Sequence, residues 1–266
     1  MPVDRPAPER AEELVHNYEG VLSRVQGAAT KYADVSKTPR LVAVSKLKPS
    51  SDILALYEHG VRHFGENYPQ ELEGKAKELP DDVAWHYIGT LQSNKCKMLA
   101  SIPNLFAIET LTSQKSANLL HSTVSSLSPP RSTPLNVFLQ INTSGESQKS
   151  GLPPLSPDQP TGEALELALH ILKECSSLRL KGVMTIGSWD ASTSDEPNPD
   201  FVKLVETRDT LLSKLREQVD VKDQVEQLGE LELSMGMSND FEEAIRMGST
   251  NVRVGSDIFG ARPPRH

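Results

Sequence analysis

The sequence predicts a single-domain (β/α)8 barrel of the TIM type with one additional helix at its N-terminus. Short apolar runs rich in β-branched residues alternate with longer stretches of helical periodicity along most of the 266-residue chain. Eight such runs can be distinguished, which is the number that closes a parallel barrel. The alternative is a doubly wound open sheet, whose first turn is normally rich in glycine, but the turn at 45–49 contains none. We expect one domain over residues 1–266, with the barrel core at about 38–262.

Each element is predicted from its own pattern. The first helix covers residues 8–28, where Leu14, Tyr18, Val21 and Val25 fall on one stripe. The eight strands are expected at 41–45, 61–65, 84–89, 105–108, 136–141, 178–184, 230–234 and 251–254. Helices follow them, one after Pro49 and the others at 67–79, 94–100, 113–121, 163–175, 201–217 and 240–247. Three segments rich in Ser, Pro, Thr and Asp are expected to be solvated loops, at 122–134, 151–162 and 188–199.

Composition excludes several classes of partner and site. The 28 basic residues are scattered among 36 acidic ones, giving a net charge of −8, so a nucleic-acid partner is not expected. No apolar run is long enough to span a membrane, and the N-terminus does not resemble a secretory signal. Cys96 and Cys175 belong to no metal-spaced cluster and are expected to be reduced thiols. The cytoplasm is the expected compartment, with a nuclear or mitochondrial pool left open, and a monomer is the expected state.

The first strand ends in Lys46, at the end of the barrel where chemistry gathers. A lysine at this point is commonly an exposed strand terminus. An amine at a barrel mouth is, however, a nucleophile for a carbonyl group when burial lowers its pKa. Lys48, two residues further on, is the other candidate for this role. Because the apolar run ends just before Lys46, we expect Lys46 to point into the mouth and Lys48 to lie in the loop.

The second and third strand ends each allow two interpretations. Asn67 either caps the following helix or contacts a ligand. His86, between two aromatic residues, is either a satisfied core histidine or a catalyst. The polar segment 90–95 either is a capped loop or faces a substrate.

The turns after the seventh and eighth strands indicate a phosphate site. Segment 234–240 contains Gly236 and Ser238, and segment 253–260 contains Gly255 and Ser256. Glycines let the backbone approach an oxyanion, serines donate hydrogen bonds, and barrels often bind phosphate after these two strands. The alternative is a pair of tight turns with helix caps. A phosphate cup next to a strand bearing a lysine would fit pyridoxal 5′-phosphate, which has an aldehyde at one end and a phosphate at the other.

These residues resemble the pyridoxal phosphate homeostasis protein family, relatives of the N-terminal barrel of alanine racemase. Five motifs carry the resemblance, in order: 43–46, 64–68, 85–89 with 91–95, 233–238, and 253–256 with 258–260. The resemblance implies that Lys46 forms a Schiff base with the cofactor and that Asn67 contacts it. It also implies that Ser238, Gly255 and Ser256 hold the phosphate and that Arg253 lies near the pyridine nitrogen.

Two functions are compatible with a pyridoxal phosphate site, and a third interpretation is a barrel that metabolises another phosphorylated small molecule and leaves Lys46 unmodified. The first is a non-catalytic protein that buffers pyridoxal phosphate and delivers it to apo forms of enzymes that use it. The second is a racemase-like enzyme. Racemisation needs acid–base groups on both faces of the substrate carbon, and alanine racemases supply one from a separate domain for which we expect no room here. We therefore expect reversible cofactor binding, with no catalytic residue and no metal.

Overall fold

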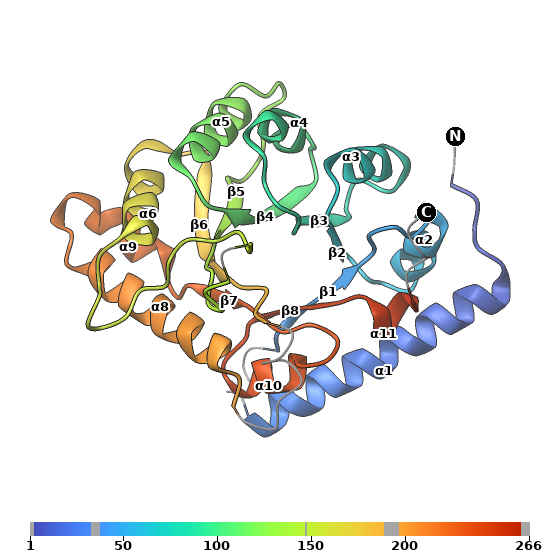
Figure 1. The fold of residues 1–266 in the computed structure, drawn as a ribbon. Coiled ribbons are helices and arrows are strands. Elements are labelled where there is room, and N and C mark those ends of the chain that lie inside the picture. The colour runs from blue at the N-terminus through green and yellow to red at the C-terminus, as the bar shows by residue number, and fades with distance from the viewer. Residues whose placement is uncertain (1–2, 33–37, 147, 189–196, 262–266) are drawn as a thin grey trace.

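Eight parallel strands form a closed barrel in chain order, with the last strand paired to the first (Figure 1). The structure is a computed structural model that describes residues 3–32, 38–146, 148–188 and 197–261. The strands are β1 (Arg40–Val44), β2 (His63–Glu66), β3 (Ala84–Tyr87), β4 (Leu105–Leu111), β5 (Leu135–Gln140), β6 (Leu178–Met184), β7 (Glu232–Ser234) and β8 (Asn251–Val254). The predicted barrel is confirmed.

Helices surround the barrel on its outside (Figure 1). They are α1 (Pro8–Tyr32), α2 (Ser50–Glu58), α3 (Pro69–Glu78), α4 (Cys96–Ala100), α5 (Gln114–Ser125), α6 (Glu163–Glu174), α8 (Pro199–Arg216), α9 (Lys222–Leu228), α10 (Phe241–Arg246) and α11 (Ser256–Phe259), with 3₁₀ turns η1 (Ser93–Lys95) and η2 (Val219–Val221). The additional helix α1 packs against α2, α10 and α11. It does so through the predicted apolar stripe, since Leu14, Val21 and Val25 are buried.

Closure of the barrel gives β1 two parallel neighbours. Ala43 pairs with Val254 of β8, and Val44 pairs with Gly65 of β2. The chain that leaves β1 therefore emerges between the ends of β2 and β8. Lys46 lies on this segment.

Alternate residues of the strands belong to different apolar clusters. Ile108, Leu139 and Val183 belong to the large cluster that also includes helix residues. Their sequence neighbours Ala107, Phe138 and Met184 form a small separate cluster with Phe106. A strand has a side-chain period of two, so the first set faces the helices and the second faces the barrel interior.

The structure corrects several predicted boundaries. α1 continues past residue 28 to Tyr32, and α5 continues to Ser125, so the loop expected at 122–134 begins later. β4 continues to Leu111 although its apolar run stops at Ile108, because the polar Glu109 and Thr110 are buried and find partners within the barrel. η2, α9 and α11 were not predicted. Of the loop expected at 188–199, residues 189–196 lie outside the described part of the chain.

Two negative findings apply to the residues that the structure describes. Within them, no helix is both long and apolar enough to cross a membrane. The same residues contain no group of three or more His, Cys, Asp or Glu side chains that could hold a metal ion. Cys96 and Cys175 are both buried free thiols.

Candidate functional site

Lys46 lies two residues after the end of β1 and is half-buried, and both of its sequence neighbours are held by hydrogen bonds. The Ser45 hydroxyl donates to Glu66 Oε1 at 2.6 Å, and the Ser45 carbonyl accepts from Lys75 Nζ at 2.9 Å. On the other side, the Leu47 N–H donates to Glu71 Oε1 at 2.7 Å. Leu47 has φ 62°, in the left-handed region that leucine rarely adopts. Hydrogen bonds to β2 and α3 thus hold the backbone on both sides of Lys46.

Lys48 lies in the loop, as predicted from the end of the apolar run. Its ammonium donates to the carbonyl of Phe259 at 2.9 Å and to that of Ala261 at 2.8 Å. These bonds tie Lys48 to the segment that follows α11. Lys48 is therefore directed toward the end of α11.

Asn67 follows β2 and does not cap the next helix. The N-cap of α3 is Tyr68, which forms no side-chain cap hydrogen bond. The Asn67 Oδ1 atom is buried and has no hydrogen-bond partner among the described residues. The capping interpretation is therefore wrong, and this amide oxygen is an acceptor that a ligand could satisfy. A Cβ atom on Gly89 would lie only 1.9 Å from the Asn67 carbonyl oxygen, so glycine is needed there for the two strand ends to approach.

The turns after β7 and β8 meet through two serines. The Ser256 hydroxyl donates to the Ser238 hydroxyl at 3.0 Å. Gly255 lies against the end of β1, since a Cβ atom there would be 3.2 Å from the Val44 carbonyl oxygen. The turn after β7 depends on Gly236, whose φ is +94°. The structure thus brings the predicted phosphate-binding residues together and sets them beside β1, which ends two residues before Lys46.

Comparison with known proteins identifies the family. The model of the alanine racemase N-terminal domain matches residues 12–263. A pyridoxal phosphate homeostasis protein of Schizosaccharomyces pombe is 46% identical over 223 residues, which is 84% of each chain. The chain belongs to the pyridoxal phosphate homeostasis protein family. The predicted family resemblance is confirmed.

Solved structures with this fold include one with the cofactor in place. A protein of unknown function from Bifidobacterium adolescentis has a TM-score of 0.73 and 30% identity, covering 97% of this chain and 98% of its own. PipY of Synechococcus elongatus, a structure with PLP bound, has a TM-score of 0.65 and 28% identity, covering 90% of this chain and 100% of its own.

Among the candidate site residues of this family member, Arg253 is the most deeply buried, with only 4% of its surface exposed. Its guanidinium donates to the Ser234 hydroxyl at 2.5 Å and to the Thr185 carbonyl at 2.7 Å. Glu109 Oε2 lies 4.0 Å from the same guanidinium. Burial lowers the pKa of Arg253, and the Glu109 charge acts in the opposite direction.

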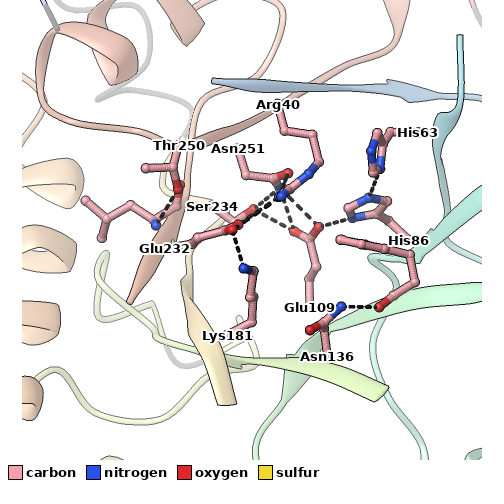
Figure 2. Close-up of polar contacts among 12 residues, drawn as sticks. Arg40, His63, His86, Glu109, Asn136, Lys181, Glu232, Ser234, Thr250 and Asn251 are labelled. Carbon is pink, nitrogen blue, oxygen red and sulfur yellow. Dashed lines mark hydrogen bonds and ion pairs between the residues drawn. The ribbon is translucent and has the colours of Figure 1, made fainter. Parts of the chain in front are cut away.

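Glu109 is the centre of a polar network inside the barrel (Figure 2). One carboxylate oxygen lies 2.6 Å from His86 Nδ1 and also accepts from Asn251 Nδ2 at 3.1 Å. The other accepts from the Ser234 hydroxyl at 2.5 Å. Burial alone would raise the pKa of Glu109, but His86, Arg253 and Ser234 together lower it to about 2. Glu109 is thus an ionised carboxylate that faces the buried Arg253 guanidinium.

His86 is a core histidine whose ring nitrogens both have partners, which was one of its two interpretations. It is fully buried between Glu109 and His63, with 2.9 Å between His86 Nε2 and His63 Nδ1. Burial, with His86 beside it, lowers the pKa of His63 to about 3. Further toward the start of the strands, Glu232 pairs with Arg40 at 2.7 Å and with Lys181 at 2.8 Å (Figure 2). The network thus joins residues along much of the barrel's length.

A second buried network surrounds Glu66 at the end of β2. Its Oε1 accepts from Lys75 Nζ at 2.7 Å, while its Oε2 is buried without a partner among the described residues. Burial raises the pKa of Glu66 to about 7, although Lys75 acts to lower it. Lys75 also contacts Glu71, at 2.6 Å.

Sequence reasoning did not assign a role to Glu66, Lys75 or Glu109. Glu109 and Glu66 each carried a signal, because a carboxylate next to a run of strand residues must be either solvated or paired. Lys75 carried none, since its position on an amphipathic helix is also that of an ordinary surface lysine.

Proposed function

We propose that this protein binds pyridoxal 5′-phosphate reversibly, holds it as a Schiff base on Lys46, and serves the homeostasis of the cofactor without efficient catalysis. Ser238, Gly255 and Ser256 would hold the phosphate. Asn67 would contact the cofactor, and Arg253 would lie near the pyridine nitrogen. When bound, the cofactor supplies an aldehyde, whose carbon forms a C=N bond with the Lys46 amine as one water molecule leaves.

The observation that carries this proposal is the contact between β1 and the turn after β8. Gly255 lies against Val44, two residues before Lys46, and Ser256 contacts Ser238. An amine and a pair of hydroxyl groups therefore border the same edge of the barrel. A ligand with a carbonyl group at one end and a phosphate at the other could react with the amine and accept hydrogen bonds from the hydroxyl groups.

Unsatisfied groups near Lys46 are consistent with such a ligand. Asn67 Oδ1 is a buried acceptor without a partner among the residues that the structure describes. A ligand that brings a hydrogen-bond donor to this position would satisfy this acceptor. The name of the S. pombe relative and the PLP bound to PipY also support this cofactor.

The position proposed for Arg253 narrows the chemistry that the bound cofactor would support but does not exclude racemisation, because racemases of this type share the feature. A guanidinium beside the pyridine nitrogen disfavours protonation of that nitrogen, which weakens the ring as an electron sink. Racemisation would also require a second acid–base group facing the substrate. We further propose a cytoplasmic monomer that passes its cofactor to apo-enzymes.

The test is the absorbance of the purified protein with pyridoxal phosphate, followed by borohydride reduction and mass spectrometry. We expect a near-ultraviolet to violet band and a reduced adduct on the peptide that contains Lys46. Lys46→Ala should lose both, and Lys48→Ala, the matched control, should keep both. An adduct on Lys48, or none at all, would contradict the Schiff-base assignment.

Two further measurements distinguish the carrier from the racemase-like alternative. Racemase and transaminase assays on common amino acids should give no turnover above that of free pyridoxal phosphate. Turnover that disappears in Lys46→Ala would establish the enzyme instead. Transfer to an apo-enzyme, compared with an equal concentration of free cofactor, should show delivery from the loaded protein.

A further inference from the structure

Both sequence neighbours of Lys46 are bonded to one buried ion-pair cluster, formed by Glu66 of β2 with Lys75 and Glu71 of α3. We call this cluster the lysine clamp. Lys75 Nζ joins its parts, because it contacts the Ser45 carbonyl at 2.9 Å, Glu66 at 2.7 Å and Glu71 at 2.6 Å. Glu71 in turn accepts the N–H of Leu47.

The charged groups of the clamp are largely removed from water. Glu66 is fully buried and Lys75 is 6% exposed. Placing an ion pair in the interior costs desolvation energy, and such pairs contribute little to stability compared with apolar residues of the same size. An apolar contact could have joined α3 to the barrel at this point. The ion pairs of the clamp instead hold the backbone around Lys46.

The backbone it controls is strained. Leu47 has φ 62°, and its side chain is 40% exposed, so burial of the leucine does not enforce this conformation. Two hydrogen bonds hold this conformation: the Leu47 N–H donates to Glu71, and the Lys48 N–H donates to the Ser45 carbonyl at 3.1 Å, which closes the turn over residues 45–48. Sparsely populated backbone conformations persist where surrounding contacts fix them, and they occur preferentially at ligand sites.

We infer that the lysine clamp positions the Lys46 amine for C=N bond formation, so that Glu71, Lys75 and Glu66 are positioning residues for covalent binding. This inference rests on the proposed Schiff base on Lys46. A clamp of this kind should affect the covalent step and leave recognition of the phosphate and the ring largely unchanged. The two contributions can be measured separately.

The experiment compares two ligands, pyridoxal 5′-phosphate and pyridoxine 5′-phosphate, which has an alcohol in place of the aldehyde and forms no Schiff base. Glu71→Ala removes the acceptor for Leu47 and one partner of Lys75. We expect it to weaken pyridoxal phosphate binding and slow C=N formation by about tenfold or more, since small misplacements of a reacting group have effects of this size. Its affinity for pyridoxine phosphate should stay within about twofold of wild type.

Two variants serve as controls. Glu71→Gln keeps an oxygen that can accept from Leu47 and should restore much of the loss. Glu73→Gln lies on the same helix and removes a surface pair with Lys77, so it should behave as wild type with both ligands. Circular dichroism and thermal unfolding establish that each variant is folded. If Glu71→Ala does not fold, Glu71→Gln provides the test, because C=N formation in Glu71→Gln should still be slower than in Glu73→Gln.

The outcomes separate the two proposals. Equal weakening of both ligands by Glu71→Ala would show a general structural role and overturn the clamp. Unchanged C=N formation in the folded Glu71 variants would also overturn it, while the Schiff base on Lys46 would stand. If wild type forms no adduct on Lys46, both proposals fail.

Discussion

The Arg253 guanidinium and the Glu109 carboxylate lie 4.0 Å apart inside the barrel, with the Ser234 hydroxyl hydrogen-bonded to both. Ser234 accepts from the cation and donates to the anion, so both of these bonds are charge-assisted. Hydrogen bonds of this kind are stronger than neutral ones, and leaving their charged partners unsatisfied in the interior is costly.

Ser234→Ala should therefore destabilise the protein although it removes a single oxygen atom. We expect a loss of about 1–3 kcal/mol in the free energy of unfolding, because two buried charged groups lose a partner. Urea unfolding at neutral pH measures it. Ser101→Ala, an exposed serine that bonds the Lys97 carbonyl, is the control and should change stability by less than about 0.5 kcal/mol. Equal stability of the two variants would contradict the importance of the Ser234 bridge.

Glu109 should make stability depend on acid pH. Its pKa in the folded protein is about 2, below the ordinary value of 4.5, so it contributes stability above about pH 4.5 that is lost as the pH falls through its folded pKa. Glu109→Gln should be strongly destabilised near neutrality, by about 3–5 kcal/mol, because a buried cation loses its counter-charge. The difference from wild type should shrink on acidification. A difference that stays constant with pH would show that Glu109 is not ionised in the folded state.

Glu66 should have the opposite pH dependence. Its folded pKa is raised to about 7, so its contribution is fully present below about pH 4.5 and declines as the pH rises through about 7. Glu66→Gln lacks this titration. Relative to wild type, the variant should gain about 1–3 kcal/mol of unfolding free energy between about pH 5 and pH 8. Urea unfolding over this range measures the gain, and Glu73→Gln should show none.

Gly89 and Gly74 should respond oppositely to alanine. A Cβ atom on Gly89 would meet the Asn67 carbonyl oxygen at 1.9 Å, whereas one on Gly74 of α3 has open space. Gly89→Ala should lower stability by about 1–3 kcal/mol and weaken ligand binding, because Asn67 must shift. Gly74→Ala should raise stability by about 0.5–1 kcal/mol through helix propensity. Thermal unfolding and cofactor titration of both variants provide the measurements, and unimpaired cofactor binding by Gly89→Ala would argue against a ligand contact by Asn67.

The sequence alone was sufficient for the barrel and for the neighbourhood of Lys46 and Ser256. Short apolar runs rich in β-branched residues mark the strands, and closure of the barrel brings the last strand beside the first, so residues far apart in sequence could be paired in advance. The interpretation of Lys48 as a loop residue followed from where the apolar run stops. These predictions rest on periodicity and topology, which are properties a sequence displays directly.

The two buried networks could not be predicted in this way. Glu109 lies inside β4, and a search restricted to strand ends does not reach it; its polarity even made the strand seem to stop at Ile108. The partners of Lys75 come from β2, from its own helix and from the turn after β1, a combination that only the packed structure defines. Of the two interpretations of Asn67, helix capping is wrong because α3 begins one residue later than a cap at that position requires.

The pairing of β1 with β8 also has a consequence for synthesis of the protein. Lys46 leaves the ribosome early, but Gly255 and Ser256 are translated some two hundred residues later, as the positions in the chain require. A nascent chain therefore displays the amine long before it can offer the serine pair. Domains fold once their elements are complete, so capture of a ligand at both ends must await the final strand. Newly made chains would thus bind the cofactor only after translation is nearly finished.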